Sequence, residues 1–216
     1  MKKLKPQPTL VDQVYDAILS GISEGKFGAG RRIKQEGIAE ILGVSRQPVQ
    51  QALLLLKNDG LLSEAPGRGL MVPALEAEVV RNVYEVRAAL DKLATMRAAE
   101  RGKVVAKEEG QSFIEAGMVA VSNGSIAEMV AADMNFHFFI YGLSGNPIIT
   151  DTGRAQWNFL RLIMGQVLLK GETPREIWEQ HSEILAAVIR GNVERAGQLA
   201  EGHIEQASST LSARLK

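Results

Sequence analysis

Apolar residues recur at helical spacing in the first part of the chain. From Leu10 to Ile22 they follow one another every three or four residues, which predicts an amphipathic helix over residues 9–25 with Thr9 as its N-cap. Two shorter runs of the same kind predict two further helices, and two β-type runs around a glycine-rich turn predict a hairpin. The helices cover residues 35–42 and 45–57, and the strands cover residues 61–64 and 70–72.

After Pro73 the pattern is helical to the end of the chain, with breaks at glycine, asparagine or proline. The predicted helices cover residues 75–101, 104–121, 125–143, 146–169, 174–190 and 192–214. Helices joined by such short loops form an antiparallel bundle. The preceding order of helix, helix, tight turn, helix and hairpin is that of a winged helix-turn-helix. We therefore predict a mainly α protein, with a winged helix-turn-helix domain over residues 1–72 and an all-α antiparallel six-helix bundle over residues 75–216.

Charge fits this division. Residues 1–72 hold ten Lys and Arg against seven Asp and Glu, whereas residues 73–216 hold fifteen against eighteen. A basic front and an acidic back are typical of a nucleic-acid-binding head on a different body. The sequence has no cysteine, no apolar run behind its N-terminal lysines and no stretch of about 20 uncharged apolar residues. We expect a cytoplasmic protein with no membrane partner.

The third predicted helix begins with side chains that suit the major groove of DNA. Arg46 can donate two hydrogen bonds to a guanine edge, and Gln47 or Gln50 can pair with adenine. Ser45 and the free main-chain N–H groups at the helix start suit a phosphate. The alternative is a small helical domain with a solvated arginine at a helix start, and pattern and charge alone leave both open.

In the predicted hairpin, Gly67 and Gly69 allow the backbone to approach DNA closely, and Arg68 supplies charge. The head also closely resembles the GntR family of bacterial regulators over nearly all of residues 9–72. The resemblance rests on Ile38-Ala39-Glu40-Ile41-Leu42-Gly43-Val44-Ser45-Arg46-Gln47-Pro48-Val49, then Ala52-Leu53, Leu56, Gly60-Leu61 and Gly67-Arg68-Gly69. It implies that Arg46 and Gly67 lie at the DNA.

Two positions depart from the family pattern. Gln50 stands where the family usually has a second recognition arginine, so an amide replaces a charged fork. Glu36 stands where several members have an arginine, and Arg32, with Arg31 and Lys34, is a candidate to take over contacts to the DNA backbone. We expect an unusual operator sequence.

The body contains all three histidines of the chain, His137, His181 and His203. Asp133 lies four residues before His137, so on a helix both side chains project from one face. One carboxylate and three imidazoles that converge from three helices would bind a divalent ion without sulfur, which suits Zn²⁺, Ni²⁺, Mn²⁺ or Fe²⁺. The alternative for each histidine is a hydrogen-bonded core residue.

The body also resembles the FadR-type C-terminal sensor domain, FCD, that accompanies this head in one GntR subfamily. The resemblance covers residues 75–212 and rests on the segments 84–91, 133–137, 144–147 and 179–187. Metal-binding members hold a divalent ion with an Asp-x-x-x-His helix and two later histidines. The resemblance therefore implies that Asp133, His137, His181 and His203 are the ligands.

Three further side chains are candidates to bind an effector. Arg87 begins from a helix expected to line the same cavity and can pair with an anion, and Asn158 and Arg161 lie on a later helix. The alternatives are a buried ion pair for Arg87 and a solvated face for Arg161. Trp157 and Trp178 are interpreted as core or interface packing.

These observations predict a metal-dependent, small-molecule-responsive transcription regulator, a repressor that senses a small carboxylate-type metabolite. Two heads that read two half-sites require a homodimer on a palindromic double-stranded DNA operator, with the first and fourth bundle helices as candidate dimer contacts. One rival is a metal-dependent hydrolase that uses the same Asp/His3 site. Another is a purely structural metal with constitutive DNA binding.

Overall fold

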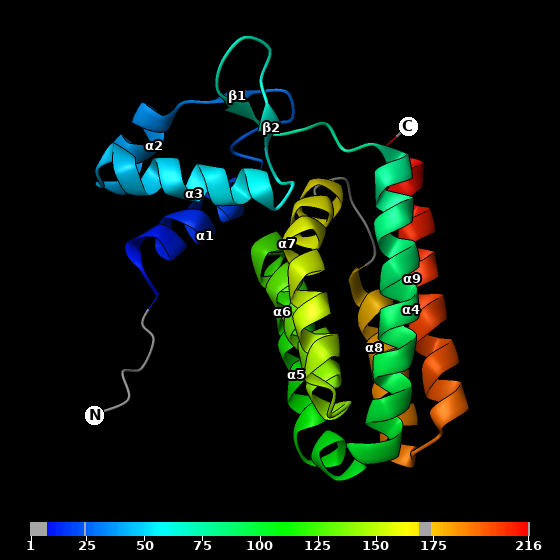
Figure 1. Ribbon diagram of the computed structural model, residues 1–216. Helices are drawn as coiled ribbons and strands as arrows, with labels where there is room; N and C mark the ends of the chain where they lie inside the picture. The colour runs from blue at the N-terminus through cyan, green and yellow to red at the C-terminus, as the bar shows by residue number, and fades with distance from the viewer. Residues whose placement is uncertain (1–7, 24, 169–173, 216) are drawn as a thin grey trace, which may run out of the picture. The chain divides into compact units, whose positions relative to one another are not determined.

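The computed structural model describes residues 8–23, 25–168 and 174–215. The chain divides into two compact units, residues 1–74 and residues 75–216 (Figure 1). In the described residues, no helix has the length and apolar character needed to cross a membrane. The predicted class, a winged helix-turn-helix followed by an all-helical body, is confirmed.

The first unit combines short helices with a small sheet. Its helices are α1 (Leu10–Ser23), α2 (Gln35–Leu42) and α3 (Arg46–Asn58), and its strands are β1 (Arg32–Ile33), β2 (Ser63–Glu64) and β3 (Leu70–Met71). The sheet has the order β1-β3-β2 and is antiparallel throughout. Strand β1 was not predicted, and it pairs Arg32 with Met71. The hairpin β2–β3 is therefore fastened to the segment between α1 and α2.

Local signals explain the helix ends of this unit. Thr9 caps α1, because its hydroxyl accepts from the backbone of Asp12 while Asp12 accepts from the backbone of Thr9. Gly43 ends α2 in the left-handed conformation, with a φ of 64°. Ser45 occupies the N-cap position of α3, but its side chain makes no capping hydrogen bond. Ser45 therefore marks the start of α3 by its position and not by a side-chain bond.

The second unit is a bundle of long helices. They are α4 (Ala77–Arg101), α5 (Lys103–Asn123), α6 (Ile126–Leu143), α7 (Pro147–Leu168), α8 (Pro174–Arg190) and α9 (Val193–Arg214). Helices α4 and α9 run side by side along most of their length (Figure 1). The bounds differ from the predicted ranges by at most two residues, and the predicted break at residues 171–173 lies outside the described residues.

Glycines on α5 let α8 approach closely. A Cβ at Gly117 would lie 2.1 Å from the indole ring of Trp178, and one at Gly110 would lie 2.5 Å from Leu185. Trp178 is buried, and its ring lies 4.8 Å from the ring of His181 one turn later on α8. The small residues of α5 thus fix the position of the helix that carries His181.

Candidate metal centre and nucleic-acid interface

The exposed face of α3 carries the predicted DNA-reading side chains. Pro48 and Val49 are buried in the head, whereas Arg46, Gln47 and Gln50 are exposed, as is Ser45. This division leaves polar donors and acceptors on the face of α3 that does not pack on the head.

Arg46 has two neighbours on α2. Its Nη1 atom lies 3.5 Å from Oε1 of Glu36, and both side chains are well exposed. Gln35 donates a hydrogen bond of 2.7 Å to the backbone carbonyl of Arg46. The acidic residue that departs from the family pattern therefore faces the candidate guanine-reading arginine.

The hairpin tip is held by Arg32. Gly67 and Gly69 have φ values of 91° and 94°, a conformation that favours glycine. The guanidinium of Arg32 donates to the backbone carbonyl of Pro66 at the tip. Arg32 thus braces the hairpin, while Arg68 is exposed at its end.

The predicted metal ligands converge in the core of the body. Asp133 and His137 come from α6, His181 from α8 and His203 from α9, and all four are buried. One donor atom from each lies within 4.8 Å of the others. The four residues are separated by up to 70 positions in the sequence, so only the packing of three helices brings them together.

The distances between donor atoms fit a shared divalent ion. Nε2 of His181 lies 3.1 Å from Nε2 of His203 and 3.5 Å from Oδ1 of Asp133. Nε2 of His137 lies 3.9 Å from Oδ2 of Asp133, and neither atom has a hydrogen-bond partner within the described part of the chain. For metal–ligand bonds of about 2.1 Å, neighbouring ligand atoms are roughly 3.0 Å apart in an octahedral site and roughly 3.4 Å apart in a tetrahedral one. The donor set therefore fits a Zn²⁺-sized ion after small shifts.

Hydrogen bonds behind the site orient two of the three rings. Nδ1 of His137 lies 2.6 Å from Oδ1 of Asp91, and Nδ1 of His203 lies 2.7 Å from Oε1 of Gln180. Gln180 in turn donates to Oε1 of Gln206 at 3.0 Å, so its own Oε1 is the atom turned to His203. Because both ring nitrogens donate outward, the Nε2 lone pairs of His137 and His203 point into the site.

Burial keeps His181 and His203 in the neutral form that a metal requires. Burial lowers the pKa of His203 to about 3, helped by the charges of His137 and Arg87. Burial and the neighbouring His203 likewise hold the pKa of His181 well below its ordinary value. Burial raises the pKa of Asp133, against the attraction of His137 and Arg87. Neutral imidazoles are ready to coordinate, and a divalent ion would replace the proton favoured by a buried carboxyl.

Arg87 lies beside the four ligands. Its guanidinium is 4.5 Å from the ring of Trp157, 3.6 Å from Oδ2 of Asp91 and 3.9 Å from Oδ2 of Asp133. Burial lowers the pKa of Arg87, but Asp91, Tyr84 and Asp133 outweigh that effect and hold it above its ordinary value. Its Nε and Nη2 atoms are buried and have no hydrogen-bond partner among the residues that the structure describes. Arg87 is therefore a buried cation with unused donors, in addition to the buried ion pair that the sequence left open.

The other effector candidates lie on α7. Arg161 is half-buried, and the side chain of Asn158 lies outside the described residues. Trp157 is buried, as its packing interpretation predicts, and its ring also forms the surface against which Arg87 lies. Trp178 is buried as well.

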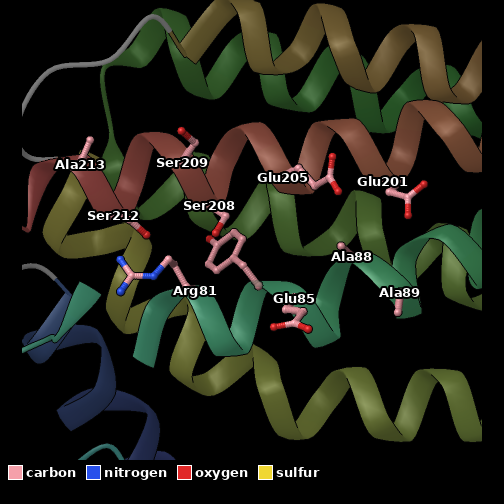
Figure 2. Close-up of a pocket in the computed structure, with 11 residues that line it drawn as sticks. Arg81, Glu85, Ala88, Ala89, Glu201, Glu205, Ser208, Ser209, Ser212 and Ala213 are labelled. Carbon is pink, nitrogen blue, oxygen red and sulfur yellow. The ribbon is translucent and has the colours of Figure 1, made fainter. Parts of the chain in front are cut away.

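A separate cavity of about 670 Å³ lies between α4 and α9 (Figure 2). Tyr84 lines it and also lies 5.5 Å from the guanidinium of Arg87. Its lining includes the three carboxylates Glu85, Glu201 and Glu205 and the single guanidinium of Arg81. This excess of negative charge makes the cavity less suitable for an organic anion than the surroundings of the Arg87 guanidinium.

Sequence reasoning missed the residues behind the ligands. Asp91 and Gln180 each bond to a ligand histidine, and the Tyr141 hydroxyl donates to Asp91 at 2.8 Å. One signal was present: Asp91 follows Arg87 by four residues on an alanine-rich helix, and Tyr141 follows His137 by four. These spacings place each pair on one helix face but cannot say which face meets which.

A winged DNA-reading head on a helical ligand-binding body defines a transcription regulator. Family comparison agrees with this class: the model for the FCD domain matches residues 82–206, and the model for bacterial regulatory proteins of the gntR family matches residues 10–72. The chain belongs to the GntR family of transcriptional regulators and carries an FCD domain, as in the FadR-type subfamily. It is a regulator and not an enzyme.

Individual relatives support this assignment. The chain is 28% identical over 207 residues to the uncharacterized HTH-type transcriptional regulator YdhC of Bacillus subtilis (strain 168), covering 92% of this chain and 89% of YdhC. It is 28% identical over 184 residues to the Nta operon transcriptional regulator of Aminobacter aminovorans, covering 83% and 84%. The solved structure of E. coli McbR/YncC has the same fold, with a TM-score of 0.83 at 24% identity, covering 97% of this chain and 100% of that one.

Proposed function

We propose that this chain is a metal-dependent repressor that binds its operator as a homodimer and responds to a small carboxylate-type metabolite. The observation that carries the proposal is the convergence of Asp133, His137, His181 and His203 beside the buried, partly unpaired guanidinium of Arg87. An ion held by these four residues would be Zn²⁺, Ni²⁺, Mn²⁺ or Fe²⁺, and would supply a Lewis-acid position for a carboxylate oxygen.

The charges of the site favour an anionic ligand. Arg87 contributes one positive charge, and Asp91 and Asp133 contribute two negative charges when ionised. Burial keeps His181 and His203 neutral, and a histidine that binds a metal is neutral as well. A divalent ion would turn this net negative charge into a net positive one. One carboxylate group would neutralise the remaining positive charge of the loaded site. Because an uncompensated buried charge is costly, this neutralisation favours the binding of a carboxylate.

The head supports operator binding with Arg46, Gln47 and Gln50 exposed on α3 and Arg68 exposed on the hairpin. We propose a palindromic operator because two identical heads related by a two-fold axis read two inverted half-sites. We propose repression because blocking a promoter requires only DNA binding, whereas activation also needs a surface for the transcription machinery.

The test is a binding titration with the full-length protein. Operator affinity is measured by fluorescence anisotropy on metal-free protein and on protein loaded with Zn²⁺, Ni²⁺, Mn²⁺ or Fe²⁺, each against a panel of organic acids at fixed salt. We expect an acid to weaken operator binding only when a metal is bound. The Arg87→Met variant should keep its metal and lose the response to acids.

Other outcomes would contradict the proposal. Operator affinity that does not change with metal or with any acid would favour a structural metal and constitutive DNA binding. Metal-dependent hydrolysis without operator binding would favour the hydrolase. Analytical ultracentrifugation of the same samples tests the homodimer, and a monomer on the operator would remove the argument for a palindrome.

A further inference from the structure

The side chain of Asp91 on α4 makes two contacts with α6 and one with its own helix. Its Oδ1 atom accepts from Nδ1 of His137 at 2.6 Å, and its Oδ2 atom accepts from the hydroxyl of Tyr141 at 2.8 Å. Nε of Arg87 lies 3.6 Å from the same Oδ2 atom. The side chain of Asp91 is only 3% exposed, so water does not compete for these contacts.

The contact with His137 determines how that ring can act. An ionised carboxylate only accepts hydrogen bonds, so the proton of a neutral His137 ring resides on Nδ1. The lone pair is then on Nε2, which is buried and lies 3.9 Å from Oδ2 of Asp133. No described residue forms a hydrogen bond with this atom. If the ring were turned over, or carried its proton on Nε2, no nitrogen lone pair would point towards the other ligands.

We propose that Asp91 is a positioning residue that sets the tautomer and ring orientation of His137 for metal binding, and that Tyr141 and Arg87 hold it in place. The inference rests on the proposed metal centre. Among the described residues, His203 has only the neutral amide of Gln180 behind it, and Nδ1 of His181 has no hydrogen-bond partner. Asp91 is therefore the only charged group hydrogen-bonded to a ligand histidine in the described part of the chain.

The arrangement also links two functions of the site. Arg87 and Asp91 are one turn apart on α4, and His137 and Tyr141 are one turn apart on α6. One carboxylate thus connects the candidate anion-binding guanidinium to a metal ligand. Asp91 also gives Arg87 a fixed direction, because Nε faces Asp91 while Nη2 faces Asp133.

The experiment compares Co²⁺ binding by metal-free, full-length variants. Visible absorption of bound Co²⁺ reports the coordination geometry, and competition with a chelator gives the affinity. We expect Asp91→Ala to weaken Co²⁺ binding by about 10- to 100-fold, the usual effect of losing such an outer partner, and to change the absorption band. Asp91→Asn, which keeps the shape and removes the charge, should give a smaller loss, as should Tyr141→Phe.

The control is Asp151→Ala, which removes an exposed carboxylate from α7 of the same unit and should leave affinity and spectrum unchanged. Circular dichroism checks the fold, and if Asp91→Ala fails to fold, Asp91→Asn decides the result. Wild-type affinity and spectrum in the folded Asp91 variants would overturn the inference while leaving the metal centre intact. A wild-type protein that binds no Co²⁺ would instead overturn the metal centre, and this inference with it.

Discussion

Replacing Arg87 by methionine tests whether the buried charges act as one unit. Methionine keeps most of the side-chain volume against Trp157 but removes the cation between Asp91 and Asp133, at 3.6 and 3.9 Å. Each attraction is about 4 kcal/mol at an effective dielectric constant of about 20. Desolvation of the guanidinium offsets part of this gain, so the expected loss is about 3 to 5 kcal/mol, as for other broken buried pairs.

The loss should depend on metal. In metal-free Arg87→Met protein, two buried carboxylates face each other without a cation, and one of them must take up a proton. A divalent ion on Asp133 supplies the missing positive charge. We therefore expect the Arg87→Met destabilisation to be largest in metal-free protein at high pH, and smaller after loading with Zn²⁺.

Tryptophan fluorescence gives a selective assay. Both tryptophans of the chain, Trp157 and Trp178, lie in the second unit, so the urea midpoint of their fluorescence reports that unit and not the head. Arg87→Lys is the matched control, because it keeps the charge and loses the planar guanidinium over Trp157. Its urea midpoint should lie between those of wild type and Arg87→Met. A metal-free Arg87→Met protein within about 1 kcal/mol of wild type would refute the reasoning.

Three further predictions concern packing, pH and DNA. Gly117→Ala should lower the free energy of unfolding by about 1 to 3 kcal/mol in urea titrations followed by fluorescence, because its Cβ would meet Trp178. Gly142→Ala, whose Cβ would have nothing within 4 Å, should not lower it. Lowering the pH from 6.5 towards 3 should destabilise metal-free protein, because His203 takes up its proton in the unfolded state and stays neutral when folded. A His203→Gln variant whose free energy of unfolding, measured in urea, falls with pH as steeply as that of wild type would contradict this. Arg46→Ala should weaken operator binding by about 1 to 3 kcal/mol and remove discrimination at one base pair. Arg68→Ala should lower the slope of log affinity against log salt concentration by about one on every operator sequence. Anisotropy on single-base variants of the operator measures both.

The fold was largely predictable because its helices are long and end at strong signals. The helix bounds agree with the predicted ranges to within two residues where the structure describes them. Strand β1 was missed because two residues, Arg32 and Ile33, carry no periodic pattern, and their strand exists only through pairing with β3. The absence of a capping bond at Ser45 was equally invisible, since serine favours this position whether or not its hydroxyl bonds to the helix.

The candidate site divides in the same way. The four ligand candidates could be predicted because histidine is rare in this chain and Asp133 is spaced from His137 by one turn. The roles of Asp91 and Gln180 could not, since aspartate and glutamine are common on exposed helix faces and only tertiary packing places these two behind histidines. The same packing decides that the guanidinium of Arg87 is buried rather than solvated.

The position of Arg87 along the chain indicates how a ligand in the body could change the DNA affinity of the head. Helix α4 begins at Ala77, just after the division between the two units, and Arg87 lies ten residues further, or about 15 Å along the helix. The candidate metal ligands lie on α6, α8 and α9 instead. A carboxylate shared by the metal and Arg87 would therefore tie the helix that is joined to the head to three helices that are not. Such a ligand affects DNA binding only if it binds two placements of α4 unequally, and a contact that spans α4 and the metal supplies that inequality.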